Sequence, residues 1–225
     1  PLANNIFESA AFLRSVPGLD RPDLQLVFQP ARRPPPSFPF PIGHGCAISP
    51  VGLYPRSRGR LMLASADPLA PPLIDPNLLS EPQDIEPLIR GIRLIRRIFA
   101  SPAFARYGVR ETAPGEGVQS DAEIADYIRA EGYTVHHPVS TCRMGRDPLA
   151  VVDPQLRVLG IEGLRVADAS VFPSIIGGNT NAAVAMVAEK AADMILGRAP
   201  LAPADLDEPA PPMRPASQET HTETS

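Results

Sequence analysis

Apolar residues recur at intervals of three and four along the segment SEPQDIEPLIRGIRLIRRIFAS, residues 80–101. This spacing places them on one face and predicts an amphipathic helix. The residues on that face are Ile85, Leu88, Ile92, Ile95 and Phe99. Ser80 followed by Gln83 has the spacing of a capping box, and Pro82 is compatible with a first helical turn. Pro87 predicts a kink or a later helix start.

A second helix is predicted over residues 120–131, SDAEIADYIRAE. Ser120 and Glu123 form another capping-box pattern at its start. Gly132 is expected to end it, because glycine readily leaves the helical conformation.

A third helix is predicted over residues 180–197, after the polar segment GGNTN. Either Asn179 or Thr180 can cap its start, and Gly197 can terminate it. Residues 182–188 are small and apolar on every face. We therefore expect the start of this helix to be buried.

Strand patterns occupy much of the remaining chain. Residues 23–30 alternate between apolar and polar side chains, which predicts a strand. Segments 46–54 and 60–66 are also strand-like and are joined by the turn-forming PRSRG, so we expect a small antiparallel sheet. Residues 164–170 predict a short strand that runs into a polar turn. The proline-rich segment 30–43 is expected to be an extended surface connection. The fold class predicted is α+β.

Composition narrows the possible functions. A chain of 225 residues provides one ordinary domain or pieces of two. The formal net charge is −4. Residues after Pro200 contain five acidic side chains and one basic one, which also gives −4, so the rest of the chain is neutral. This balance makes nucleic acid an unexpected partner. No apolar run approaches the roughly 20 residues of a membrane span, and cytoplasm is the default expectation without a signal peptide.

The segment TVHHPVSTCRMG, residues 134–145, is the first candidate for chemistry. An imidazole titrates near neutral pH and can accept a proton. Pro138 holds the backbone after His137 and favours an extended conformation for His137 itself. A purely structural histidine explains the same pattern. We prefer a structural role for the adjacent His136 and assign none to His44.

The second candidate is the GGNTN segment before the third helix. Its two glycines allow the backbone to approach another group closely. The unpaired amides and positive dipole end of a helix suit an anion. An ordinary capped helix start is the alternative, although a buried helix end with free donors requires a partner.

Other chemistries are weaker. Cys142 could act as a nucleophile with His137 as its base, but nothing in the sequence visibly lowers the thiol pKa. The spacing of His136, His137 and Cys142 matches no common zinc pattern, so no metal is expected. The chain also lacks the G-x-G-x-x-G fingerprint of a dinucleotide-binding turn.

The string HHPVSTCRMG, followed by VVDPQLRVLGIEGLRVADASVFPSIIGGNTNAAVAMVAEKAADMIL, resembles the C-terminal part of the glucose–methanol–choline (GMC) flavin oxidoreductases. The similarity is greatest to the choline dehydrogenase-like branch and runs from about residue 5 to 197. It implies an FAD cofactor and an alcohol substrate, primary or polyol, that is oxidised to an aldehyde or ketone.

The resemblance also implies roles for individual residues. His137 and Asn179 correspond to the catalytic pair, with proton abstraction by His137 and hydride transfer to flavin N5. The turn of Asp168 and Ala169 would contact the flavin, and the helix start at Thr180 and Asn181 would lie beside the isoalloxazine ring. Ser140 departs from the glycine that the family often has there.

Three regions are expected on this basis. Residues 1–144 correspond to a substrate-binding segment with an antiparallel sheet and the catalytic histidine loop. Residues 145–198 supply the C-terminal strand and helix of a Rossmann-like FAD-binding domain whose N-terminal part is missing. Residues 199–225, which include His221, form a disordered tail. The expected partner is the flavin-binding N-terminal half, from the same gene or a separate chain. A non-catalytic fragment or subunit that docks onto such a half is the alternative.

Overall fold

The computed structural model describes residue 7 and residues 9–31 and 44–202. Most of the proline-rich connection and of the predicted tail therefore lies outside the described residues, as does His221. The described chain forms antiparallel sheets and helices, and the α+β prediction is confirmed.

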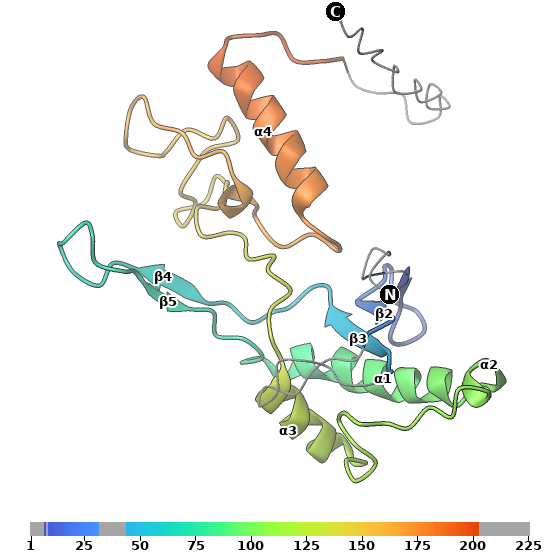
Figure 1. Cartoon of the computed structure of the whole chain (residues 1–225). Coiled ribbons are helices and arrows are strands. Elements are labelled where there is room, and N and C mark those ends of the chain that lie inside the picture. Colours follow the sequence, from blue (N-terminus) through green and yellow to red (C-terminus); the bar gives the residue numbers. More distant parts are fainter. Residues whose placement is uncertain (1–6, 8, 32–43, 203–225) are drawn as a thin grey trace, which may run out of the picture.

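A three-stranded antiparallel sheet contains β1 (Ser9–Leu13), β2 (Leu24–Gln29) and β3 (Ala47–Gly52), with β2 in the centre. A separate two-stranded arm contains β4 (Arg60–Met62) and β5 (Leu73–Asp75) and extends away from this sheet (Figure 1). The sequence pattern indicated β2, β3 and β4 but neither β1 nor β5.

The predicted pairing of segment 46–54 with 60–66 is wrong. β3 pairs with β2, and β4 pairs with β5. The intervening turn is held elsewhere, because the backbone amides of Arg56 and Ser57 donate to the carboxylate of buried Asp84 at 2.7 and 2.9 Å. This carboxylate directs the chain away from β3 and prevents a simple hairpin.

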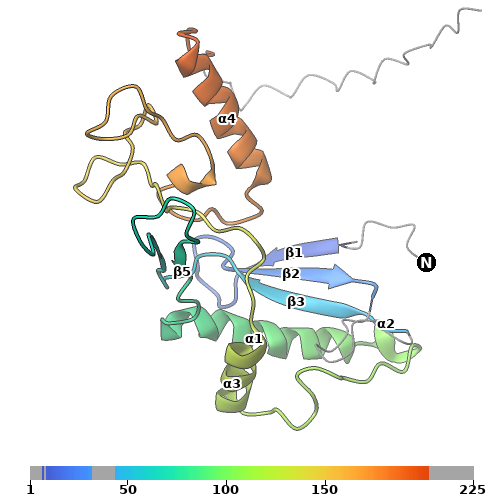
Figure 2. The ribbon, with the colours of Figure 1, turned by 60° about the vertical axis from the view of Figure 1, so that its left-hand side comes forward.

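Helix α1 (Pro82–Phe99) covers one face of the three-stranded sheet (Figure 2). It begins at Pro82 and continues through Pro87, so the later start does not occur. The predicted capping box is also wrong, because the N-cap is Glu81 and no side chain of the described residues caps it. Asp84 in the first turn binds the neighbouring loop instead.

A short helix, α2 (Pro102–Ala105), follows, and then α3 (Asp121–Glu131) packs against α1. The predicted capping box of Ser120 and Glu123 is confirmed, with both reciprocal hydrogen bonds formed, and Gly132 is the C-cap. The two longer helices share an apolar cluster. Its buried members are Ile85, Ile92, Ile124, Ala125 and Ile128.

The rest of the described chain forms a second packed unit around η1 (Ala169–Val171) and α4 (Asn181–Ile195). Its buried residues are Val152, Leu156, Val171, Phe172, Val187 and Ala191. The strand predicted over 164–170 does not form. Arg165 makes only an isolated bridge with Arg157, and the chain then turns into the 3-10 helix.

Helix α4 starts and ends as predicted, with Thr180 as N-cap and Gly197 in the left-handed conformation that terminates it. The expectation that its start is buried on every face is wrong for this chain. Val187 lies against the cluster, whereas Met186 is 57% exposed. Within the described ranges, no helix or strand covers that outer side (Figure 1).

Across the described residues, the structure has no helix with the length and apolarity to cross a bilayer.

Gly91 marks the closest approach of α1 to the sheet. A Cβ atom there would lie 2.8 Å from Cβ of Pro50 and 3.2 Å from the methyl groups of Leu24. Gly91→Ala should therefore lower the free energy of unfolding by about 1–2 kcal/mol, because overpacking outweighs the gain in helix propensity. Urea unfolding measures this change. Gly117→Ala is the control, since its Cβ would meet no described atom within 4 Å; equal stability of the two variants would contradict the packing argument.

Asp147 provides a pH-dependent contribution. Hydrogen bonds from Arg143, at 2.9 and 2.5 Å, and from the amide of Leu149 lower the pKa of Asp147 to about 2. Its unfolded pKa is about 3.9. The stabilisation is therefore complete above about pH 4 and is lost as the pH falls towards 2.

Asp147→Asn should accordingly reduce the loss of stability between about pH 4 and pH 2. Thermal unfolding across that range measures the effect. Arg143→Ala should reduce the loss in a similar way, and the double variant should add little because both changes remove one interaction. A pH dependence of Asp147→Asn as steep as that of the unsubstituted chain would contradict this assignment.

Candidate functional site

The loop between α3 and η1 carries both adjacent histidines, and the structure separates their roles. His136 is exposed, has a φ of +63°, and donates its backbone N–H to Oγ1 of Thr134. His137 is half-buried and is followed by Pro138. The left-handed residue and the proline together constrain the backbone on both sides of the His137 ring.

The His137 ring contacts two consecutive residues at the start of α4. Its Nε2 atom lies 3.0 Å from Nδ2 of Asn179, and its Nδ1 atom lies 3.0 Å from Oγ1 of Thr180. Asn179 and Thr180 follow His137 by 42 and 43 positions in the sequence. The fold therefore brings together the two separate segments that the sequence indicated as candidates for chemistry.

The double glycine before α4 permits a close backbone approach, as predicted. A side chain at Gly177 would overlap the hydroxyl and ring of Tyr54, and a Cβ at Gly178 would lie 3.9 Å from the ring of Phe12. The guanidinium of Arg21 stacks 3.8 Å from the centre of the Tyr54 ring. The end of the three-stranded sheet thus supports the loop that presents Asn179.

In the described chain, the first-turn amides of α4 donate no hydrogen bond to an N-cap side chain. Thr180 is the N-cap, but its side chain makes no capping hydrogen bond within the described chain and contacts His137 instead. Amides in the first turn of a helix have no intrahelical acceptor, and both Asn181 and Ala182 are exposed. These donors and the positive dipole end fit a group that carries negative charge, such as the pyrimidine edge of a reduced flavin.

Asp168 and Ala169 lie in the turn that begins η1. The Asp168 carboxylate accepts hydrogen bonds from the backbone N–H and hydroxyl of Ser170, at 2.8 and 2.5 Å. This turn adjoins the histidine loop, because the amide of Cys142 donates to the Ser170 carbonyl at 3.0 Å. The predicted flavin-contacting turn and the histidine loop are therefore neighbours, but the Asp168 carboxylate itself stabilises η1.

The Cys–His hydrolase arrangement receives no support from the geometry. Both ring nitrogens of His137 already face Asn179 and Thr180, and no hydrogen bond joins the ring to Cys142 in the part of the chain that the structure describes. The described part of the chain contains no group of three or more His, Cys, Asp or Glu side chains placed to hold a metal ion.

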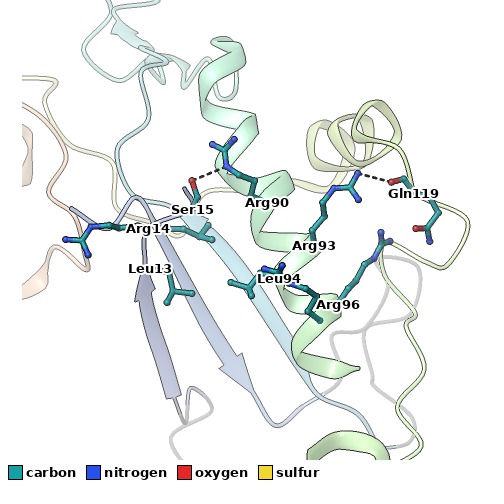
Figure 3. Close-up of a pocket in the computed structure, with 10 residues that line it drawn as sticks. Leu13, Arg14, Ser15, Arg90, Arg93, Leu94, Arg96 and Gln119 are labelled. Carbon is teal, nitrogen blue, oxygen red and sulfur yellow. Dashed lines mark hydrogen bonds between the residues drawn. The ribbon is translucent and has the colours of Figure 1, made fainter. Parts of the chain in front are cut away.

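An open pocket that is rich in arginine lies between β1 and α1 (Figure 3). Arg90 donates to Oγ of Ser15 at 3.1 Å, and Arg93 donates to the carbonyl of Gln119 at 3.2 Å. Arg96 pairs with Glu111 at 2.8 Å. Because the chain supplies these acceptors, we interpret these arginines as supports for the surrounding loops. His137 does not line this pocket.

Sequence reasoning identified His137, Asn179 and Thr180 but missed Tyr54, Arg21 and Phe12. The double glycine indicated that something approaches the backbone. It carried no information about which distant side chain does so.

Comparisons with known proteins identify the family of this chain. The GMC oxidoreductase family profile matches residues 55–188. An alcohol dehydrogenase [acceptor] from Pseudomonas putida is 46% identical over 204 residues, which are 91% of this chain and 37% of the relative. An oxygen-dependent choline dehydrogenase from Rhizobium johnstonii is 48% identical over 202 residues, with 89% and 37% covered. The chain thus spans little more than a third of these relatives.

Solved structures show the same relationship. Pyridoxine 4-oxidase from Mesorbium loti has a TM-score of 0.75 and 32% identity over 86% of this chain and 38% of that one. A formate oxidase from Aspergillus oryzae RIB40, described in terms of FAD modification, has a TM-score of 0.68 and 32% identity, with 80% and 32% covered. The matching profile, the similar relatives and the common fold show that this chain belongs to the GMC oxidoreductase family.

Proposed function

We propose that this chain is the C-terminal, proton-handling portion of an FAD-dependent oxidoreductase that converts an alcohol to an aldehyde or ketone. The observation that carries the proposal is the 3.0 Å approach of Nδ2 of Asn179 to Nε2 of His137. Two polar groups from distant segments converge there on one point. That point suits a single small oxygen-containing group.

The roles of the two residues follow from their chemistry. A substrate hydroxyl that displaces this direct contact, with its oxygen beside both groups, accepts a hydrogen bond from the Asn179 amide and gives its proton to Nε2 of His137. The carbon–hydrogen bond supplies the electron pair, and the carbon–oxygen bond becomes a carbonyl. FAD, when bound, would accept that pair as a hydride at N5. General-base assistance of this kind contributes about 10²–10⁴-fold to rate.

We propose that two neighbouring parts of the chain hold the flavin. The first is the start of α4, where Thr180 and Asn181 offer backbone donors at the positive end of the helix. The second is the turn of Asp168 and Ala169, which is hydrogen-bonded to the histidine loop through Ser170. Membership of the GMC oxidoreductase family and the FAD of the similar formate oxidase support FAD as the flavin.

The partner that we propose is a flavin-binding N-terminal half. The chain covers only 37% of the curated relatives, so most of their length has no counterpart here. Two apolar surfaces are open to receive such a half. One is the outer side of α4, with Met186. The other is the two-stranded arm, where Leu63, Leu69 and Ile74 are 85%, 89% and 70% exposed.

We also propose the division at residues 144 and 145 between a substrate-binding part and a flavin-domain part. Two apolar clusters with no common buried member support a division near the histidine loop. Val139 and Met144, which follow His137, already pack against the second cluster. His137 therefore lies close to the boundary between the two parts.

The visible absorbance spectrum is the first test. We expect flavin bands when the chain is co-expressed with a matching flavin-binding half, and none when it is purified alone, because most cofactor contacts would come from that half. A co-purified complex with no flavin would overturn the enzymatic proposal. It would favour the alternative that this chain is a non-catalytic docking subunit.

His137→Ala should slow substrate-dependent flavin reduction by about 10²–10⁴-fold while flavin remains bound. Stopped-flow absorbance measures the rate, and the visible spectrum measures flavin content. His136→Ala is the matched control, because His136 is the exposed neighbour in the same loop. A reduction rate unchanged in His137→Ala would overturn the assignment of the base.

A further inference from the structure

Thr180 has an unusual arrangement for a helix N-cap. A threonine in this position normally accepts a hydrogen bond from a first-turn amide, an interaction worth about 1 kcal/mol. Here φ and ψ are −84° and −16°, and the hydroxyl makes no such bond to any described amide. It lies instead 3.0 Å from Nδ1 of His137, and the residue is only 7% exposed.

A neutral imidazole has one N–H and one lone pair, so the two contacts of His137 depend on each other. In one arrangement, Nδ1–H donates to the Thr180 hydroxyl and Nε2 accepts from the Asn179 amide. In the other, the Thr180 hydroxyl donates to Nδ1 and Nε2–H donates to the Asn179 carbonyl oxygen. Only the first arrangement leaves Nε2 able to receive a proton.

The structure favours the first arrangement, because Asn179 presents its amide nitrogen, Nδ2, to Nε2. The amide nitrogen of an asparagine side chain only donates hydrogen bonds, so Nε2 of His137 is the acceptor. Nδ1 then carries the hydrogen, and the hydroxyl oxygen of Thr180 is its acceptor at 3.0 Å.

We propose that Thr180 is a positioning residue that holds His137 in the Nδ1–H tautomer and keeps Nε2 directed at the substrate oxygen. This inference rests on the proposed role of His137 as the base. When Nε2 takes the substrate proton, the imidazolium donates from both nitrogens. The hydrogen bond from Nδ1 to Thr180 is then already formed and becomes charge-assisted, so the Thr180 hydroxyl does not need to rotate.

The test uses the flavin-loaded complex with histidine labelled by ¹⁵N. Nitrogen spectra distinguish a protonated from an unprotonated ring nitrogen, and the signals of His137 are assigned from those lost in His137→Ala. We expect a protonated Nδ1 and an unprotonated Nε2 in the unsubstituted protein and in Thr180→Ser. Thr180→Val, which replaces the hydroxyl with a methyl group, should shift the proton to Nε2 or give a mixture.

Flavin reduction provides the second readout. Thr180→Val should slow the limiting rate by about tenfold, the value of one hydrogen bond of about 1.4 kcal/mol. Substrate affinity should change little, because the proposed role of Thr180 does not involve substrate contact. Thr180→Ser should restore most of the rate, since it retains the hydroxyl.

Two results would overturn the inference. One is a protonated Nε2 in the unsubstituted protein, which requires no variant to fold. The other is an unchanged tautomer in Thr180→Val or, if that variant does not fold, in Thr180→Ala. Failure of the proposed function would look different: His137→Ala would leave flavin reduction unaffected, whereas the nitrogen spectra would still report the tautomer.

Discussion

The contacts of His137 with the start of α4 join two parts of the molecule that have separate apolar clusters. Helices α1 and α3 form one cluster, and η1 and α4 form the other. The loop that carries His137 leaves α3, and its residues Val139 and Met144 pack on the second cluster. The ring therefore comes from a loop that begins in the first part and is held by side chains of the second. For the base that we propose, a ring fixed in this way loses little freedom when substrate binds, which favours general-base chemistry.

The start of α4 combines three functions within a few residues. Gly177 lies against Tyr54, Asn179 and Thr180 contact the two ring nitrogens, and no side chain of the described residues caps the first turn. If the hydroxyl of Thr180 turned to cap α4, it would give up its hydrogen bond with Nδ1 of His137. The local cost of an uncapped helix is about 1 kcal/mol. The proposed base would contribute about 10²–10⁴-fold to rate, which corresponds to about 3–5 kcal/mol. Local stability is thus reduced where the proposed chemistry requires a specific geometry.

Residue patterns predicted the three long helices, α1, α3 and α4, because the information for each is local, but not the short α2 and η1. The apolar spacing of α1, the capping box of α3 and the terminal glycine of α4 each act within a few positions. Strand partners were less predictable. The buried carboxylate of Asp84 redirects the chain after β3 through hydrogen bonds from the amides of Arg56 and Ser57, which lie 28 and 27 residues earlier. The site itself shows the same division. Family motifs indicated His137 and Asn179, whereas the hydroxyl contact of Thr180 and the support from Tyr54 arise only when distant segments meet.

The contact between Gly177 and Tyr54 has a consequence for protein engineering. Tyr54 lies just beyond β3 and stacks with Arg21, so the sheet and the Asn179 loop are mechanically linked through one aromatic ring. Substitutions at the end of the sheet would therefore displace Asn179 without being near its side chain. Under the proposed function, variant libraries built on that side of the molecule would change reactivity, unless Tyr54 and Gly177 are varied together.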